Sequence, residues 1–219
     1  MRLTCLSILS AVLMTMALTL GAAAQTSGNR NTVNAAINVA GQATIDNLMN
    51  AYEGERNTQA RYEAYAKKAD EEGYHQVASM FRAVARGEDI HAGNFASVLQ
   101  NYGGTPHADV QTPVVSTTRE NLDAAVLDED HESTATYPSF IKQARKDRNQ
   151  DAERAFSYSK YAEASHSVIY RQALDDLESF RGGSQNFFVC PKCGRTCVAT
   201  VKGKCPVCST PQNEFEVIH

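Results

Sequence analysis

The chain has 219 residues, of which 42% are hydrophobic and 21% are charged. This balance is typical of a globular protein and argues against a disordered or membrane-embedded chain. The formal net charge of -4 gives no reason to expect a nucleic-acid partner, which normally needs a basic surface. The length allows one medium domain with a small appendage, or two small domains.

The first 24 residues have the pattern of a secretory signal peptide. Arg2 gives a positive start, residues 6–20 are apolar, and Ala22–Ala24 offer a small-residue cleavage site. The apolar run is short for a membrane span, so a cleaved signal is favoured over a retained anchor, which is the alternative. We therefore expect residues 1–24 to be removed, residues 25–39 to form a flexible leader, and the mature protein to be exported, with the periplasm as its compartment.

Two amphipathic helices are predicted next, because inward-facing residues recur three and four positions apart. The first extends from about Ile45 to Gly73, and the second from about His75 to Tyr102. Residues 103–117 then contain two prolines and no helical periodicity. A connection of this length suits the crossover between the second and third helices of ferritin-like bundles.

Two further helices are predicted in the second half of the chain. Thr118 is a plausible N-cap of the third helix, in which Pro138 should produce a kink. The fourth helix extends from about Gln150 to Phe180, before a Gly-Gly-Ser linker. A shift of 75 residues aligns aromatic, acidic and histidine positions of the two halves, which indicates a duplicated helical hairpin. The sequence thus predicts a mainly α fold, a ferritin-like four-helix bundle over residues 40–182.

Five carboxylates and two histidines fall on the inward faces of these helices. Each unpaired buried charge is costly, and no matching set of lysines or arginines occupies the same faces. A polar seam is the alternative, but bound cations are the natural counter-charge. Glutamates with two Glu-x-x-His pairs are typical of di-iron or di-manganese sites in such bundles. The candidate ligands are Glu55, Glu88, His91, Glu129, Glu132, Glu163 and His166.

Two tyrosines lie one or two turns beyond these ligands on the same helical stripes. Tyr62 and Tyr137 are candidates to donate hydrogen bonds to ligand carboxylates, although inward tyrosines are equally often ordinary core residues. Two divalent ions would bring four positive charges against the five carboxylates, so the reduced site would be nearly balanced. The site is therefore suited to two-electron cycling.

The C-terminal segment carries two Cys-x-x-Cys pairs, Cys190 with Cys193 and Cys205 with Cys208. Paired knuckles are a strong signal for one tetrahedral four-thiolate metal site, although an oxidising compartment makes two disulfides the alternative. Metal binding would also explain how about 35 residues fold with so small a core. Zinc and iron fit the ligand count equally well, and the role of Cys197 stays open.

Taken together, these motifs resemble the rubrerythrin family. The two Glu-x-x-His pairs, the Glu129-x-x-Glu132 pair and the Tyr137-Pro-Ser-Phe140 sequence are similar to its di-iron domain. The Cys-Pro-x-Cys pairs are similar to its C-terminal rubredoxin-like domain, which we place at residues 186–219. The resemblance covers nearly all of the mature chain, and implies a non-haem di-iron peroxidase that reduces hydrogen peroxide to water.

The resemblance also implies roles for individual residues. The seven candidate ligands would hold two irons, and Glu132 and His91 would exchange at one iron between oxidation states. The four paired cysteines would hold a third iron, with zinc as the alternative, that feeds electrons to the other two. Glu132, His91, Tyr62 and Tyr137 are the expected catalytic residues. Family members are commonly homodimers in which the thiolate iron lies near the di-iron site of the partner subunit.

Some features depart from the family pattern. The interval between the knuckles is one residue shorter than expected, and Arg195-Thr196-Cys197 replaces the usual aromatic residues. A signal peptide also implies an electron donor outside the cytoplasm, either another redox protein or a membrane-linked carrier. Two other functions stay open: a ferroxidase or iron-handling protein, and a non-enzymatic metal or redox sensor with a structural zinc site.

Overall fold

The computed structural model describes residues 41–199 and 202–219. The predicted signal peptide and leader lie outside these residues. Among the helices that are described, none is long and apolar enough to cross a membrane.

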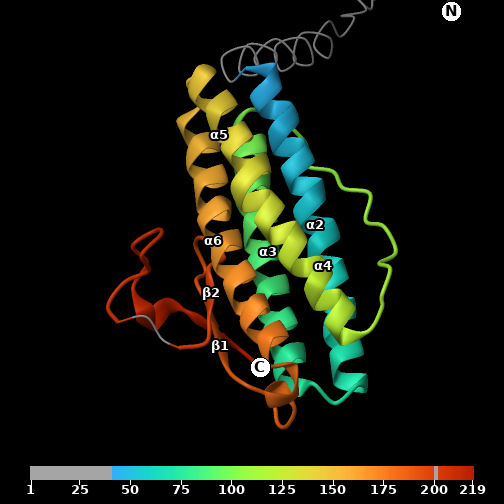
Figure 1. The fold of residues 1–219 in the computed structure, drawn as a ribbon. Helices are drawn as coiled ribbons and strands as arrows, with labels where there is room; N and C mark the ends of the chain where they lie inside the picture. Colours follow the sequence, from blue (N-terminus) through green and yellow to red (C-terminus); the bar gives the residue numbers. More distant parts are fainter. Residues whose placement is uncertain (1–40, 200–201) are drawn as a thin grey trace, which may run out of the picture.

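The helices form an elongated bundle of two hairpins, and the two columns within each hairpin are antiparallel (Figure 1). The first hairpin consists of α2 (Gln42–Glu71) and α3 (His75–Asn101). The second consists of α4 (Thr118–His131) and α5 (Tyr137–Lys146), which share one column, and α6 (Gln150–Asp175). The predicted mainly α four-helix bundle is therefore confirmed.

The two hairpins are joined by a long connection that runs along the outside of α2 (Figure 1). It extends from residue 102 to residue 117, as the sequence predicted. The side chain of Asn57 on α2 accepts a hydrogen bond from the Gln111 amide (2.8 Å) and donates one to the Asp109 carbonyl (3.4 Å). These contacts hold the middle of the connection against the first helix.

The N-cap of α4 is Thr117, so the prediction of Thr118 was wrong by one residue. The Thr117 hydroxyl accepts a hydrogen bond from the Glu120 amide, and the Glu120 carboxylate accepts one from the Thr117 amide. This reciprocal capping box needs a Thr-x-x-Glu spacing, which only the earlier threonine provides.

The third column is not an α-helix kinked at Pro138, as the sequence predicted. A π-helical turn, η1 (Glu132–Thr136), separates α4 from α5, and Pro138 lies in the first turn of α5. Proline is well suited to a first turn because its missing N–H has no partner to lose there. The break in the α-helix therefore lies before the proline. The π turn accommodates one residue more than a regular α-helical turn would.

The α-helix of the fourth column is shorter than predicted. The α-helix α6 ends at Asp175, and a 3-10 turn, η2 (Leu177–Phe180), follows it. The chain then enters a small module beside the lower half of the bundle (Figure 1).

The C-terminal module contains an antiparallel three-stranded sheet in the order β2-β1-β3. Its strands are β1 (Phe187–Val189), β2 (Thr196–Cys197) and β3 (Glu216–Ile218), with a short 3-10 turn, η3 (Gln212–Glu214), before the last. The sheet contacts α3 and α6 of the same chain. An ion pair between Arg86 of α3 and Glu216 (2.7 Å) fastens the module to the bundle.

The apolar core of the bundle is divided into two clusters. One surrounds Tyr62 and Phe81, and the other surrounds Tyr137 and Phe156. Along the columns, the predicted carboxylates and histidines lie where one cluster gives way to the other. The packing on both sides thus fixes the helices around a polar centre.

Candidate metal centres

Two helices each supply a glutamate and a histidine to the polar centre. Glu88 and His91 lie three residues apart on α3, and Glu163 and His166 lie three residues apart on α6. This spacing puts both side chains on one face of a helix. All four side chains are fully buried.

The first group of donors surrounds His91. Its Nδ1 atom lies 2.8 Å from Glu88 Oε2 and 3.0 Å from Glu163 Oε1. Glu55 of α2 completes the group, with its Oε1 atom 3.5 Å from the same nitrogen. One atom from each of these four residues lies within 4.8 Å of the others, which is compact enough for one metal ion.

The second group surrounds His166 in the same manner. Its Nδ1 atom lies 2.9 Å from Glu163 Oε2 and 3.3 Å from Glu88 Oε1. Glu129 of α4 completes this group, with Oε2 at 3.4 Å. Glu88 and Glu163 therefore belong to both groups, and each directs one oxygen to each histidine. Two metal ions bridged by these two carboxylates are the arrangement that this geometry fits.

The inner atoms of the two groups lack ordinary hydrogen bonds. The Nδ1 atoms of both histidines and both oxygens of Glu88 and Glu163 are buried without a hydrogen-bond partner among the described residues. Buried polar atoms are normally satisfied, because leaving them unpaired is costly. Their convergence on two shared points is the chemistry of a metal-binding donor set.

The electrostatics of the centre also indicate protons that a metal would displace. Burial and the charge of Glu88 raise the pKa of Glu55 to about 8, and the same causes raise the pKa of Glu129. Burial opposes ionisation of Glu88 as well, but the two histidines outweigh it and lower its pKa to about 2. The pKa of His91 is raised because its carboxylate neighbours, Glu163 foremost, outweigh the effect of burial. Metal binding should therefore release protons.

The predicted tyrosines contact the two outer carboxylates. Tyr62 donates a hydrogen bond to Glu129 (2.7 Å), and Tyr137 donates one to Glu55. Each tyrosine thus donates its hydrogen bond to a carboxylate of the other hairpin. The hydrogen bonds were expected from the sequence, and a catalytic role for the hydroxyl groups stays a prediction.

Glu132 lies outside both four-residue groups. It begins the π turn and is only partly buried, whereas Glu129, one turn earlier, is fully buried. Burial and the nearby Glu55 nevertheless raise its pKa well above the usual value. Its assignment as a ligand stays a prediction.

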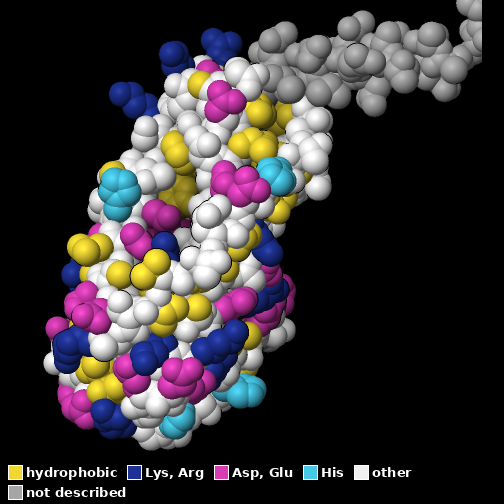
Figure 2. Space-filling model, turned by 90° about the vertical axis from the view of Figure 1, so that its right-hand side faces the viewer, with side chains coloured by type: hydrophobic (Ala, Val, Ile, Leu, Met, Phe, Trp, Pro, Cys, Tyr) yellow, Lys and Arg dark blue, Asp and Glu magenta, His cyan; other side chains and the backbone are white. Residues whose placement is uncertain are grey.

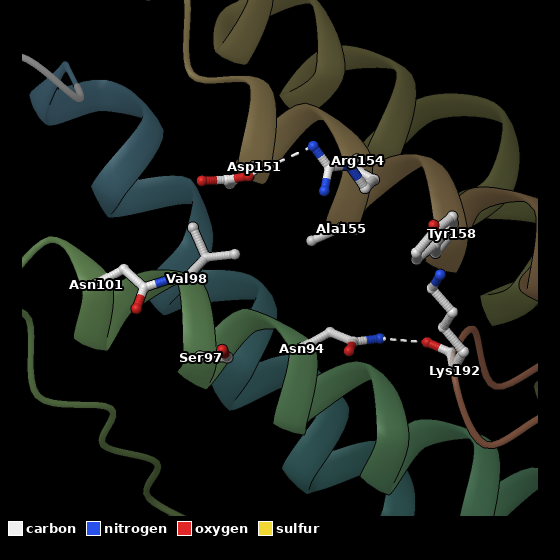
Figure 3. A pocket seen from close by; sticks show the side chains of 9 residues that line it. All are labelled: Asn94, Ser97, Val98, Asn101, Asp151, Arg154, Ala155, Tyr158 and Lys192. Carbon is white, nitrogen blue, oxygen red and sulfur yellow. Dashed lines mark hydrogen bonds and ion pairs between the residues drawn. The ribbon is translucent and has the colours of Figure 1, made fainter. Parts of the chain in front are cut away.

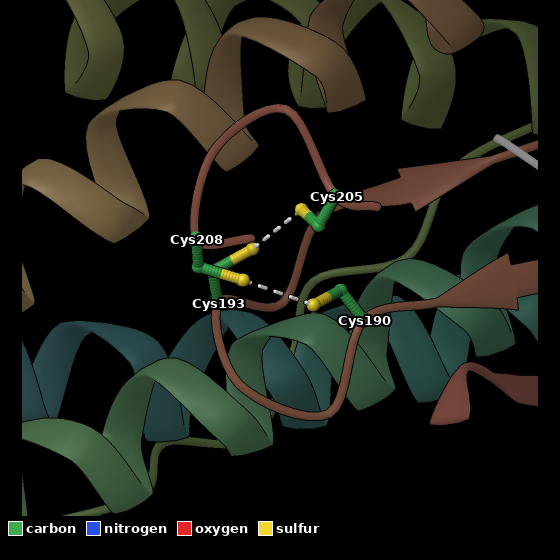
Figure 4. Close-up of side chains that lie close together, drawn as sticks. All are labelled: Cys190, Cys193, Cys205 and Cys208. Atoms are coloured by element: carbon green, nitrogen blue, oxygen red, sulfur yellow. Dashed lines mark hydrogen bonds between the residues drawn. The ribbon is translucent and has the colours of Figure 1, made fainter. Parts of the chain in front are cut away.

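The four paired cysteines converge in the C-terminal module (Figure 4). The sulfur atoms of Cys190 and Cys208 are 3.4 Å apart, and those of Cys193 and Cys205 are 3.6 Å apart. Disulfide sulfurs would be about 2.05 Å apart, whereas four thiolates around one metal are separated by about 3.8 Å. The four atoms therefore fit one tetrahedral metal site. Cys197 is not part of it, and its sulfur lies 3.6 Å from the Phe188 carbonyl.

The first knuckle lies directly on the two metal-binding histidines. The Nε2 atom of His91 donates to the Cys193 carbonyl (3.0 Å), and that of His166 donates to the Gly194 carbonyl (3.3 Å). These contacts fix Nε2 as the donor of each ring and leave Nδ1 to bind a metal. Asn94 adds a third contact, with its amide 3.0 Å from the Lys192 carbonyl at the edge of a surface pocket (Figure 3).

Two glycines make this close approach possible, and the sequence interpretation did not identify them. A Cβ atom on Gly194, which has φ +73°, would lie 2.2 Å from His91 Nε2. A Cβ atom on Gly87 of α3 would lie 2.8 Å from the Gly194 carbonyl oxygen. A glycine inside a helix, immediately before a candidate ligand, was the available signal.

The contacts of the knuckle lie within one chain, whereas the family resemblance implies a thiolate iron near the partner subunit. Exchanging the module between two chains would preserve each of these contacts. The homodimer therefore stays a prediction.

The rubrerythrin family model matches residues 46–174, more than half of the chain. The chain belongs to the rubrerythrin family. Nigerythrin of Nitratidesulfovibrio vulgaris is 34% identical over 174 residues, which cover 79% of this chain and 85% of nigerythrin. Rubrerythrin of Porphyromonas gingivalis is 32% identical over 184 residues, with 81% of this chain and 91% of that protein covered. The solved structure of fully reduced, all-ferrous nigerythrin aligns with a TM-score of 0.74 at 34% identity, over 80% of this chain and 86% of that chain.

Membership of the rubrerythrin family agrees with the geometry of both centres. The carboxylate and histidine groups fit a di-iron site, and the four cysteines fit a further iron, as the sequence predicted. The ferritin-like class of the bundle is confirmed by the nigerythrin alignment. The chain is thus a di-iron redox protein of a family associated with oxidative stress.

Proposed function

We propose that the protein is a non-haem di-iron peroxidase that reduces hydrogen peroxide to water, with electrons that arrive singly through the four-cysteine iron. The observation that carries this proposal is the contact between the first knuckle and both metal-binding histidines. Carbonyl groups beside the thiolate ligands bond to the imidazoles of the di-iron site. A reductant built into the chain suits repeated reduction of an oxidant.

The reaction consumes two electrons and two protons for each peroxide and releases two waters. The carboxylate and histidine groups would hold two irons, which would supply electrons for cleavage of the O–O bond. The chain supplies protons and a dry environment. Burial and the nearby Glu55 raise the pKa of Glu132 well above its usual value, which favours this carboxyl group as the proton donor to a peroxide oxygen. Tyr62 and Tyr137 hold hydroxyl protons at the two outer carboxylates.

The positions of His91 and Glu132 support a ligand exchange during the cycle. His91 belongs to the first donor group, while Glu132 lies just outside it. Replacing Glu132 with alanine should leave the bundle folded but slow peroxide turnover about a hundredfold, because one iron would lose its alternative ligand. Unchanged turnover in this variant would overturn the exchange.

The test of the function compares two oxidants after the metals have been counted. Anaerobically purified protein should contain about three irons per chain and show a red ferric-thiolate spectrum that bleaches on reduction. Peroxide should restore the colour much faster than dioxygen does. Faster reoxidation by dioxygen would favour a ferroxidase, and a colourless thiolate site with two irons and one zinc would remove the internal donor.

We also propose that the protein is exported and works as a homodimer. The export proposal rests on the sequence of residues 1–24. The electron donor would then be a redox protein or membrane-linked carrier outside the cytoplasm. Cell fractionation with an antibody against the bundle tests the location, and recovery in the cytoplasm at full length would contradict it.

A further inference from the structure

A hollow in the surface leads to Glu132. Figure 2 shows the face that carries α2 and the long connection, and the hollow opens in its upper half. A cavity of about 290 Å³ lies between α2 and the column formed by α4 and η1. Its lining residues are Gly54, Asn57, Thr58, Arg61, Asp128, His131, Glu132 and Thr136. A peroxide molecule, which needs little more room than a water of about 30 Å³, fits this space easily.

A second cavity of about 360 Å³ lies beneath the long connection. It shares Asn57, Arg61 and Asp128 with the first cavity. Arg61 of α2 and Asp128 of α4 form an ion pair (2.9 Å) that lies on the boundary between the two spaces. The pair is electrically neutral as a whole, so it presents no net charge to a neutral molecule.

Arg61 is held firmly and still has donors to offer. Its Nη2 atom also bonds to the Thr58 hydroxyl (3.2 Å), and its guanidinium lies 5.6 Å from the ring centre of Tyr62. Its Nε atom is buried and has no hydrogen-bond partner among the described residues. Arg61 also lines both cavities, so the outer N–H groups of its guanidinium are available to a small hydrogen-bonding molecule there.

Gly54 lies on the wall of the first cavity, immediately before the ligand Glu55. A Cβ atom added there would meet nothing within 4 Å, so neither packing nor backbone conformation requires a glycine. Glycine inside a helix destabilises it relative to alanine. At Gly54 the absence of a side chain leaves this part of the cavity wall open.

We propose that this cavity is the access route by which a small neutral peroxide reaches Glu132 and the di-iron site, that Gly54 keeps the route open, and that the Arg61 guanidinium donates a hydrogen bond to a peroxide oxygen on the way. The inference rests on the proposed peroxidase function, to which it adds a route and a binding group. Larger organic hydroperoxides should react more slowly, because the route passes between the side chains of α2 and those of α4 and η1.

The decisive variant is Gly54→Leu, with Gly93→Leu as its matched control. Gly93 is an exposed glycine of α3 whose added Cβ would also meet nothing within 4 Å, and it lines neither cavity. Both substitutions favour the helix. Gly54→Leu should lower kcat/KM for hydrogen peroxide about tenfold through a higher KM, and Gly93→Leu should stay within about twofold of the parent. Equal kinetics of the two variants would overturn the route.

Azide gives a readout that does not depend on turnover. This three-atom ligand resembles peroxide in size, and its binding to the oxidised protein can be followed by absorbance. Its association should slow about tenfold in Gly54→Leu and stay unchanged in Gly93→Leu. If azide association slows in Gly54→Leu but not in Gly93→Leu, and the parent protein does not reduce peroxide, the proposed function fails and the route stands. If peroxide is reduced and both rates are unaffected by Gly54→Leu, only the route fails.

Arg61→Lys tests the binding group separately. Lysine keeps the positive charge beside Asp128 but lacks the planar guanidinium with its several N–H donors. The KM for peroxide should rise about threefold to tenfold while kcat changes little, which a general loss of structure would not produce. An unchanged KM would overturn the role of Arg61 in binding peroxide.

Discussion

The two halves of the bundle are near copies of each other, and their aromatic packing shows how closely they agree. The rings of Tyr62 and Phe81 are 5.7 Å apart in the first half. The rings of Tyr137 and Phe156, which lie 75 positions later, are 6.2 Å apart. Each half thus holds its tyrosine in the same way, and two copies of one hairpin produce a nearly symmetric cage for two metals.

The two halves differ in the spacing between the outer glutamate and the tyrosine, which is one residue longer in the second half. Seven positions separate Glu55 from Tyr62, whereas eight separate Glu129 from Tyr137. The π turn absorbs the additional residue, so Glu129 still meets Tyr62 across the centre as Glu55 meets Tyr137. Glu132 begins this turn and has no equivalent in the first half. The added residue therefore distinguishes the two sides of a nearly symmetric cage, and an extra carboxylate begins the turn that absorbs it.

Glu88→Ala should have the largest effect, because Glu88 bridges both halves. Its two oxygens face the two histidines, so its removal weakens both metal positions at once. Iron at the carboxylate centre should fall from about two per chain to nearly none, with the thiolate spectrum retained. Glu55→Ala, which removes a donor from only one of the two groups, should leave about one iron per chain at this centre. Iron analysis on both variants checks this, and equal losses would contradict the bridging role.

Gly194→Ala should nearly abolish electron flow between the two centres. Its methyl group would collide with His91, and its backbone has φ +73°, which disfavours any side chain. Gly203→Ala is the control, since Gly203 has φ +85° but open space around it. Stopped-flow reoxidation of the thiolate iron should slow about a hundredfold in Gly194→Ala and less than threefold in the control. Similar rates in the two variants would show that contact with the histidines is unimportant.

Deletion of Ala135 should make the second half resemble the first. Removing one residue from the π turn restores a spacing of seven between Glu129 and Tyr137 and an ordinary α-helix. The two iron positions should be retained, while peroxide turnover should fall about tenfold to a hundredfold because Glu132 rotates away from the centre. Iron content and turnover measured on the same sample decide this. Full turnover in the deletion variant would remove the π turn from the mechanism.

The sequence predicted the helices and the polar centre, which depend on periodicity, but it did not predict the π turn, which depends on one additional residue. The stripes that carry Glu88 and Glu163 identify the helices and the polar centre, because a spacing of three or four is a property of every helix. The π turn could not be read, because its i to i+5 bonding follows from the whole column being held at both ends by packing. Contacts of Gly194 and Arg61 bring together distant segments, so no local pattern encodes them.

Metal-free protein should lose stability as the pH rises from about 5 to 8. The pKa of Glu55 is raised from 4.5 to about 8, and the pKa values of Glu129 and Glu132 are raised well above 4.5. The folded state therefore binds more protons than the unfolded state in this range, and folding weakens as these protons are lost. Melting temperatures of the metal-free protein should fall by several degrees, and iron loading should remove the trend. A flat or rising profile without metal would contradict the raised pKa values.

Tyr137→Phe should slow turnover more than Tyr62→Phe, although the two hydroxyl groups contact equivalent carboxylates. Tyr170 lies 5.6 Å from Tyr62, and its hydroxyl is buried without a hydrogen-bond partner among the described residues. The equivalent neighbour of Tyr137 is Phe95, which has no hydroxyl. After Tyr62→Phe, Tyr170 can still donate to Glu129 through a water, so about threefold slowing is expected, against about tenfold for Tyr137→Phe. Adding Tyr170→Phe to Tyr62→Phe should raise the loss to about tenfold, whereas a double variant no slower than Tyr62→Phe would show that Tyr170 does not compensate for Tyr62.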